Sequence, residues 1–372
     1  MRTDRPRRIA IVHSFYSQRT PSGENVVVLA QVEALREAGH DVVLVAQRAE
    51  EREARRTYPL EAAATAASGI GPSPVRQLRR FGPDVVHVHN LFPNFGTRWL
   101  GQWRGPLVAT LHNFRPVCSN GYLFRDGQVC TLCIDSSSLQ AVRHKCFHDS
   151  AVATAPVAWR TRRGVSGDAV LSRADVTVVL SERARDIFTA NGYPLDRMQL
   201  VPNFTDDPYG ALPAERPPGG FLYAGRISAE KGVLGLAASW PGAEQLDVAG
   251  YGPQEDELRA AAGPSVRLLG RVDPEELARA RPGYEALLIP SLWFEGAPLV
   301  FVEALAAGLP VIALEGSGAA DSVLAHGVGT TVPRPLTEAG LRAALAEIRA
   351  GGASLRQHCR AVYAQHFSKQ TW

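Results

Sequence analysis

The chain contains two successive series of short apolar segments that alternate with segments of helical spacing, and this pattern constrains its fold most. In the first half, residues 8–13 and 41–46 are apolar runs on either side of residues 25–38, which have helical spacing and are followed by Gly39. Nearly continuous apolar runs are typical of parallel strands buried on both faces, and glycine is favoured just after a helix. The further strands expected in this half are residues 84–89, 107–112 and 175–180.

The second half repeats the alternation after a proline-rich segment, residues 206–220, which we interpret as the connection. The strands expected beyond it are residues 221–224, 245–249, 266–269, 286–289 and 311–314. Alternating strands and helices predict parallel sheets covered by helices, so we expect an α/β protein with two Rossmann-like domains that face a cleft. The predicted divisions are an N-terminal domain (1–198), a linker (199–220), a C-terminal domain (221–355) and a short tail (356–372) that returns towards the N-terminal domain.

Composition excludes several classes of protein. Of the 372 residues, 45% are apolar and 21% are charged, which excludes a disordered chain and a coiled coil. The longest weakly charged stretch, residues 296–314, is interrupted by Glu303 and Pro310, so no transmembrane helix is predicted. The N-terminal residues lack the apolar core and cleavage site of a signal peptide, and we therefore expect a cytoplasmic protein.

The small net charge conceals an asymmetry between the two halves. The first 198 residues hold 26 Lys and Arg against 18 Asp and Glu, whereas the remaining residues hold 14 against 19. A basic first domain would face an anionic partner, either a lipid-linked acceptor or a membrane surface, while chance scatter of surface arginines is the alternative. Peripheral contact with the inner face of the membrane is therefore one prediction, and no nucleic-acid partner is expected.

Two carboxylates frame the start of a predicted helix in the second half. Residues 290–298 form a loop after a strand, and a helix is predicted to begin at Pro298 and to end before Gly308. Glu295 then lies in the loop and Glu303 within the helix. Free N–H groups at a helix N-terminus bind phosphate, and carboxylates beside them accept hydrogen bonds from sugar hydroxyls. A glutamate that only caps or solvates the helix is the alternative for Glu303.

Two cations flank a glycine-containing turn upstream of these carboxylates. Residues 225–232 read Gly-Arg-Ile-Ser-Ala-Glu-Lys-Gly and follow the first strand of the second half. Arg226 and Lys231 would both reach one diphosphate from this turn. The chain has only three lysines, and the ammonium group is a compact point charge suited to phosphate. A solvated turn without a ligand is the alternative.

Together these two elements resemble glycosyltransferase family 4, whose members are retaining enzymes of the GT-B fold. The resemblance is carried by an E-x7-E element, Glu295 and Glu303, and by a G-R-x3-E-K-G element, residues 225–232. It extends over nearly the whole chain, from residue 9 to about residue 367. The resemblance implies a GT-B fold and transfer of a sugar from a nucleotide donor.

In the second half the resemblance implies a donor site. Arg226 and Lys231 would hold the donor diphosphate, and Glu295 would bind hydroxyls of the donor sugar. Glu303 would bind the nucleotide ribose. The phosphates would also meet main-chain N–H groups, those of Leu299 and Val300.

In the first half the resemblance implies two further site residues. Ser22-Gly23-Glu24-Asn25 matches a glycine-containing loop of the family, in which Gly23 approaches the diphosphate. His112, at the end of a predicted strand, matches the active-site histidine, which would position the donor sugar and the acceptor. A histidine that is merely satisfied at a strand end is the alternative.

The implied reaction moves a hexosyl group from a UDP- or GDP-sugar to a saccharide, a lipid-linked saccharide or a natural product. Breaking the anomeric C–O bond leaves negative charge on the diphosphate, so fixed positive charge is the main requirement and no cofactor is needed for catalysis. Two alternatives stay open, a GT-B-fold sugar-nucleotide epimerase and a non-catalytic partner subunit that binds a nucleotide sugar.

Four cysteines of the first half lie close together in sequence: Cys118, Cys130, Cys133 and Cys146. In a reducing cytoplasm, four thiolates at this spacing would close a structural tetrahedral zinc site, while four buried, reduced cysteines are the alternative. The segment resembles a subgroup of the family from bacterial surface-polysaccharide clusters, which predicts a role in polysaccharide biosynthesis.

Overall fold

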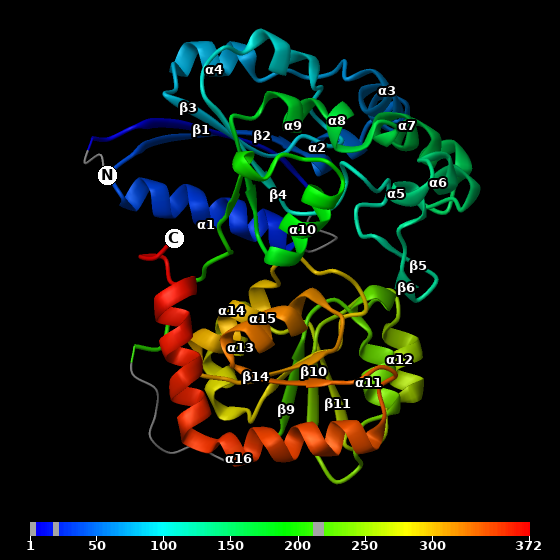
Figure 1. Ribbon diagram of the computed structural model, residues 1–372, viewed down its shortest axis with the longest axis vertical. Coiled ribbons are helices and arrows are strands. Elements are labelled where there is room, and N and C mark those ends of the chain that lie inside the picture. The colour runs from blue at the N-terminus through cyan, green and yellow to red at the C-terminus, as the bar shows by residue number, and fades with distance from the viewer. Residues whose placement is uncertain (1–4, 18–21, 211–218) are drawn as a thin grey trace. The chain divides into compact units, whose positions relative to one another are not determined.

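The computed structural model describes residues 5–17, 22–210 and 219–372, and it divides into two compact units. The first unit comprises Met1–Leu123 and Cys130–Val201, and the second comprises Phe124–Val129 and Pro202–Trp372. Within the described residues each unit contains one six-stranded sheet (Figure 1). The predicted α/β class with two Rossmann-like domains is confirmed. Residues 211–218 of the predicted linker lie outside the described residues, and the predicted domain limits stay predictions.

The sheet of the first unit is parallel throughout, in the order β2-β1-β3-β4-β7-β8. Every strand expected in this half forms. Its central strands are buried because helices cover both faces, which accounts for their continuous apolar sequences. The short edge strand β8 was not expected. The strands are β1 (Arg8–Phe15), β2 (Asp41–Arg48), β3 (Val85–Asn90), β4 (Leu107–Leu111), β7 (Val176–Val179) and β8 (Met198–Leu200).

Helix α1 (Gly23–Glu37) connects β1 to β2 and ends as the sequence predicts, with Gly39 at φ +86°. The segment between β2 and β3, which had no clear capping signals, forms three short helices. A small hairpin, β5 (Phe124–Arg125) with β6 (Gln128–Val129), interrupts the cysteine segment. The other helices of this part of the chain are α2 (Ala49–Glu53), α3 (Tyr58–Ser68), α4 (Val75–Phe81), α5 (Leu132–Asp135), α6 (Leu139–Arg143), α7 (Ala151–Thr161), α8 (Gly164–Gly167), α9 (Ala169–Arg173) and α10 (Glu182–Ala190).

The sheet of the second unit is also parallel, in the order β11-β10-β9-β12-β13-β14. Every residue of β9, β10, β12 and β13 is buried. Their sequences are apolar except for Asp247 of β10, which pairs with Arg267. The edge strand β14 was not expected. The strands are β9 (Phe221–Ala224), β10 (Leu246–Ala249), β11 (Val266–Gly270), β12 (Leu287–Ile289), β13 (Val311–Leu314) and β14 (Gly329–Val332).

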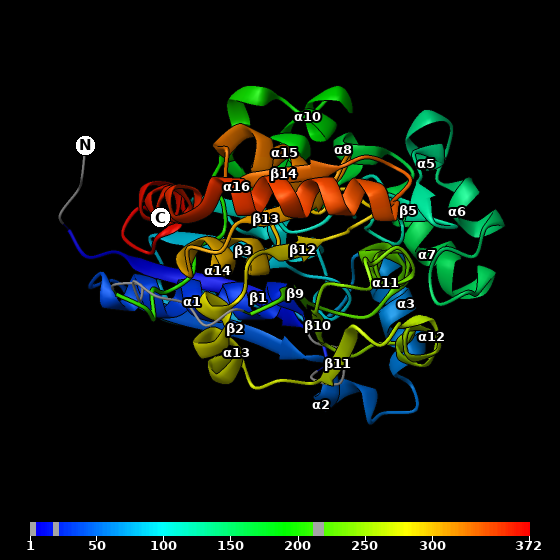
Figure 2. The same ribbon diagram turned by 90° about the horizontal axis from the view of Figure 1, so that it is seen from below.

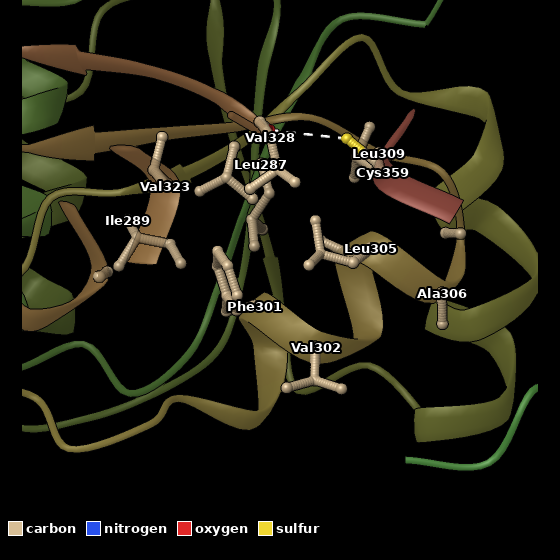
Figure 3. Packing of buried hydrophobic residues seen from close by; sticks show 14 of the residues in the cluster. Leu287, Ile289, Phe301, Val302, Leu305, Ala306, Leu309, Val323, Val328 and Cys359 are labelled. Carbon is tan, nitrogen blue, oxygen red and sulfur yellow. Dashed lines mark hydrogen bonds between the residues drawn. The ribbon is translucent and has the colours of Figure 1, made fainter. Parts of the chain in front are cut away.

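Helix α14 (Leu299–Ala306) packs its apolar face onto this sheet. In Figure 3, Phe301 and Leu305 point from α14 towards Leu287 of β12, within a cluster of buried residues. Pro298 is the N-cap residue, so the helix begins one residue later than predicted. The remaining helices of this unit are α11 (Val233–Ala238), α12 (Glu255–Ala261), α13 (Pro274–Ala280), α15 (Gly318–His326) and α16 (Glu338–Val362).

Helix α16 consists of two segments that meet at a bend (Figure 1). The bend falls at Gly352, whose φ of +50° lies outside the helical region. Figure 2 shows the first segment running beside β14, with which it is in contact. The second segment leads to a π-helical turn, Tyr363–Phe367, and the Tyr363 hydroxyl donates a hydrogen bond to the Thr205 carbonyl at 2.7 Å. The end of the chain therefore packs on the segment that enters the second unit, while its predicted return to the N-terminal domain stays a prediction.

Candidate active site

The order of strands in the second sheet places two loops side by side. Strand β9 lies between β10 and β12, so the connections that follow β9 and β12 leave neighbouring strands at the same carboxyl edge. In open α/β sheets ligands bind at such a point, where the strand order reverses. The loop after β9 holds Arg226 and Lys231, and the loop after β12 holds Glu295. The structure therefore brings together the two elements that the sequence singled out.

Lys231 and Glu295 form an ion pair between these two loops. The Lys231 ammonium donates to Glu295 Oε1, and the Ser291 hydroxyl donates to Oε2 at 2.7 Å. Glu295 is buried, with 7% of its surface exposed, so both oxygens of its carboxylate are held by protein groups. The pair gives this edge of the sheet a fixed cation and a fixed hydrogen-bond acceptor.

Gly232 allows the two loops to approach. Its φ is +69°, and a Cβ atom at this position would lie 2.2 Å from the Pro290 carbonyl oxygen. A side chain would therefore be strained by its backbone conformation and would also collide with the neighbouring loop. The glycine that ends the G-R-x3-E-K-G element is required for the contact that seats Lys231 beside Glu295.

Arg226 has no ion-pair partner among the described residues. Its main-chain carbonyl accepts a hydrogen bond from the Tyr223 hydroxyl at 2.7 Å, which ties down the turn, and its guanidinium group is left available to an anion. Leu299 and Val300 form the first turn of α14, and no side chain caps this turn. Both residues are partly exposed, so the helix N-terminus keeps uncapped N–H groups near Glu295 in the chain.

Glu303 has a partner that sequence reasoning missed. The guanidinium group of Arg281 donates to Glu303 Oε2, and Arg281 itself is only 6% exposed. A buried arginine thus fixes the position of the carboxylate on α14. Arg281 lies in no motif, because it is brought to Glu303 by packing between separate segments of the chain. The only sequence signal was an arginine beside Pro282 at the end of a predicted helical stretch.

In the first unit, histidines gather at the carboxyl ends of adjacent parallel strands. His112 follows β4, and its Nε2 atom lies 2.9 Å from Nδ1 of His89 on β3. Burial lowers the pKa of His112 to about 3 and that of His13, on β1, to about 4. Burial also lowers the pKa of His87 to about 4, and its Nε2 atom lies 2.7 Å from the Thr110 hydroxyl. Near neutral pH these rings are uncharged hydrogen-bonding groups.

A small pocket opens beside His112. It has a volume of about 50 Å³, and its lining includes His89, Asn90, His112, Asn113, Arg115 and Arg160. The arginine side chains stack on one aromatic ring, since the guanidinium carbons of Arg115 and Arg160 lie 4.3 and 5.7 Å from the centre of the Phe92 ring. The predicted position of His112 at a polar strand end is therefore found, while its role stays a prediction.

Gly23 is the first residue of α1, behind the N-cap residue Ser22. The next residue, Glu24, was quoted in the sequence only as part of the loop motif, yet its pKa is strongly shifted. Burial raises the pKa of Glu24 to about 7, and this increase is opposed by Arg115 and by hydrogen bonds from Asn90 and Asn113. The sequence did contain a signal for this residue. Glu24 lies in the first turn of a helix, and the predicted strand before that helix ends in a histidine, His13.

None of the four clustered cysteines, all of which are among the described residues, is in a disulfide. Burial raises the pKa of the Cys133 thiol to about 11, and the neighbouring Cys118 and Cys146 thiols add to this increase. Among the described residues, no three His, Cys, Asp or Glu side chains are arranged so that they would hold a metal ion. The zinc site therefore stays a prediction, which elemental analysis of the purified protein and titration of its thiols would decide.

Comparison with known proteins identifies the family of the chain. The family model described as Glycosyltransferase Family 4 matches residues 21–207, and the model described as Glycosyl transferases group 1 matches residues 218–349. A glycogen synthase of Mycobacterium tuberculosis is 26% identical over 309 residues, which cover 79% of this chain and 67% of that protein. A phosphatidyl-myo-inositol mannosyltransferase of Mycolicibacterium smegmatis is 28% identical over 336 residues, which cover 86% and 79%.

Solved structures show the same fold. A sucrose-phosphate synthase from Thermosynechococcus elongatus superposes with a TM-score of 0.65 at 20% identity, covering 98% of this chain and 96% of that one. Anabaena HepE in complex with UDP and glucose superposes with a TM-score of 0.62 at 16% identity, with the same coverage. The chain has two parallel Rossmann-like sheets and matches both family models. It is therefore a glycosyltransferase of the GT-B fold and belongs to glycosyltransferase family 4.

Proposed function

We propose that the protein is a retaining glycosyltransferase that moves a hexosyl group from a UDP- or GDP-sugar to a saccharide, a lipid-linked saccharide or a natural product. The observation that carries the proposal is the Lys231–Glu295 pair, held across two adjoining loops with the unpaired Arg226 on the same turn. These groups offer two cations to a diphosphate and a carboxylate to sugar hydroxyls. The names of the similar mannosyltransferase and glycogen synthase support hexosyl transfer and polysaccharide biosynthesis.

The proposed mechanism follows from where charge develops. As the anomeric C–O bond breaks, the diphosphate gains negative charge, and Arg226, Lys231 and the first-turn N–H groups of α14 stabilise it. Glu295 accepts hydrogen bonds from the sugar, and Glu303, held by Arg281, accepts them from the ribose hydroxyls. The acceptor hydroxyl attacks the same face of the sugar that the diphosphate leaves, and its proton passes to the departing phosphate oxygen. This route needs no carboxylate pair of glycosidase type.

A panel of nucleotide sugars tests the proposal. One UDP- or GDP-hexose should raise the melting temperature by a few degrees, about what ligand at 100 times its Kd produces, and should be hydrolysed slowly without an acceptor. Conversion of the donor to a different nucleotide sugar would instead support an epimerase. Binding without hydrolysis, and without transfer to any of the three acceptor classes, would support a non-catalytic partner subunit. Failure of every donor to bind would contradict the proposal.

A contact with anionic lipid at the inner face of the membrane is the second part of this proposal. Among the described residues, no helix has the length and apolar composition needed to cross a bilayer. Helices α6 and α7 lie side by side (Figure 1) and carry three exposed apolar side chains, which we call the α6–α7 patch. The patch consists of Leu139, Val152 and Trp159, which are 73%, 85% and 56% exposed.

Exposed basic side chains lie at the C-terminal ends of α6 and α7. Arg143, Arg162 and Arg163 are exposed, and the guanidinium carbon of Arg162 lies 3.8 Å from the centre of the Trp159 ring. An exposed tryptophan among arginines suits the boundary between anionic headgroups and acyl chains. The same positive charge would draw an anionic, lipid-linked acceptor to the first unit.

Trp159→Ala should weaken binding to vesicles that contain anionic lipid by about tenfold, because the ring no longer inserts into the headgroup region. The measurement is co-sedimentation with phosphatidylglycerol-containing vesicles at low and high salt, with binding of the wild type lost at high salt. Leu324→Ala, which removes a 66% exposed apolar side chain from α15, serves as the matched control and should bind like the wild type. Binding that ignores salt, or that the Trp159 variant retains, would contradict this part of the proposal.

A further inference from the structure

Two hydrogen-bond acceptors face one another inside the first unit. The Tyr16 N–H donates to Asn25 Oδ1 at 3.3 Å, and Asn25 Nδ2 donates to the Tyr16 carbonyl at 3.1 Å. These two bonds fix which end of the Asn25 amide is oxygen. That oxygen also lies 3.1 Å from His13 Nε2, so this nitrogen carries the hydrogen and donates it. In the neutral ring, His13 Nδ1 is therefore a bare lone pair.

His13 Nδ1 lies 3.9 Å from Glu24 Oε1. Both atoms are buried, and neither has a hydrogen-bond partner among the described residues. The His13 side chain is fully buried and that of Glu24 is 9% exposed, so water does not compensate either atom. Two buried lone pairs that face each other repel unless one of them carries a proton.

Two asparagine side chains already donate hydrogen bonds to the Glu24 carboxyl group. The Asn90 oxygen accepts from the Phe92 N–H at 2.9 Å, and the Asn113 oxygen accepts from the Arg115 N–H at 3.0 Å. Both amide groups therefore turn their NH2 ends to the Glu24 carboxyl, to which they donate hydrogen bonds. The missing hydrogen bond is the one between Oε1 and Nδ1.

We infer that Glu24 and His13 hold one proton between Oε1 and Nδ1, and that this proton fixes the first turn of α1 against the end of β1. With the proton, Glu24 Oε1–H can donate to His13 Nδ1 once a small movement brings the two atoms closer than the 3.9 Å that separates them here. When it passes to solvent, the carboxylate faces a lone pair and the contact weakens. Glu24 is thereby a positioning residue for the first turn of α1, which begins at Gly23, and this role rests on the proposed glycosyl transfer.

The neighbouring groups leave Glu24 as the one that titrates near neutrality. Burial places the pKa of Glu24 at about 7. His13 lies beside Glu24, His89 lies beside His13, and His112 lies beside His89. All three histidines have pKa values lowered by burial, while burial raises the pKa of Tyr16 above its usual range. The nearby Arg115 guanidinium lowers the pKa of Glu24 and so favours the ionised carboxylate. Activity that requires the first turn of α1 to be held against β1 should then fall as pH rises through about 7.

The first test does not use activity. The infrared band of a protonated carboxyl group should be present at about pH 6, should disappear towards pH 8, and should be absent from Glu24→Gln at both. Glu33→Gln, an exposed position on the same helix, should keep the band. A band that Glu24→Gln retains, or no band in the wild type at pH 6, would overturn the shared proton whatever reaction the protein carries out.

The second test links the proton to the proposed reaction. For the wild type and Glu33→Gln, kcat/KM for transfer should fall about tenfold between pH 6 and pH 8. In Glu24→Gln the amide donates permanently to Nδ1, so the ratio of kcat/KM at pH 6 to kcat/KM at pH 8 should stay near one. Glu24→Asp keeps the carboxyl group, but its side chain is too short to reach Nδ1. It should lower kcat/KM at both pH 6 and pH 8, which separates loss of the contact from loss of the charge. A Glu24→Gln profile that falls like the wild type would overturn the positioning role.

Discussion

Lys231→Ala should lower the rate of glycosyl transfer about 1000-fold while leaving the second unit folded, since removal of one donor that stabilises developing charge costs 10²–10³ in kcat. The variant also leaves Glu295, buried against Ser291, without its cation. Both effects act on the same step, because the cation and the carboxylate are predicted to hold the two ends of the bond that breaks. Single-turnover transfer with the donor found in the panel measures the effect, and circular dichroism checks the fold.

Two further variants sharpen this test. Glu295→Ala should abolish transfer as well, because Lys231 then lacks the partner that aims it. Arg259→Ala removes a cation from the same unit, but its side chain is 65% exposed and pairs with Glu255 on α12, so transfer should not change. Lys231→Arg keeps the charge on a planar group that does not replace a compact ammonium, and it should recover only part of the rate. Full turnover by Lys231→Ala or Glu295→Ala would overturn the assignment of the donor site.

The sequence predicted the central strands because burial on both faces leaves a plain signal. Strands such as β9 and β13 are buried at every residue, so nearly every position must be apolar and the run is visible without its neighbours. The edge strands β8 and β14 are short and contain polar residues, such as Gln199 and Thr330, because one side of each strand has no neighbouring strand. Their sequences do not differ from those of loops.

The residues of the candidate site also fall into two groups, those predicted from the sequence and those missed. Lys231 and Glu295 were predicted because each lies in a local motif, and the two motifs follow adjacent strands. Arg281 and Glu24 were missed because their significance depends on partners far away in sequence, Glu303 for the first and the strand ends of His13 and Asn90 for the second. Spacing along the chain cannot express a contact that only the packed fold creates. Identifying such residues requires knowing which strand ends are neighbours.

Acidification should unfold the first unit between about pH 6 and pH 4, before the second unit. His13 has a folded pKa of about 4 against about 6.5 in the unfolded chain, so the unfolded state binds more protons in this range. The stabilisation is therefore complete above about pH 6.5 and is lost as pH falls towards 4. For His13, which is fully buried, the difference is about 3 kcal/mol, a large share of the usual 5–15 kcal/mol of stability.

Other titratable groups near His13 decide how much stability the first unit loses on acidification. His87 and His112 shift in the same direction, but their side chains are partly exposed and contribute less than His13. Glu24 acts in the opposite sense, since its raised pKa favours the folded state as pH falls from about 7 to 4.5. Glu24→Gln keeps a permanent donor to His13 Nδ1, so it should stabilise the first unit above about pH 7 and leave its acid midpoint unchanged. Hydrogen exchange resolved to peptides measures the two units separately. A Glu24→Gln variant that is no more stable than the wild type at pH 8, or a second unit that opens first on acidification, would show that this cluster does not govern how the stability of the first unit depends on pH.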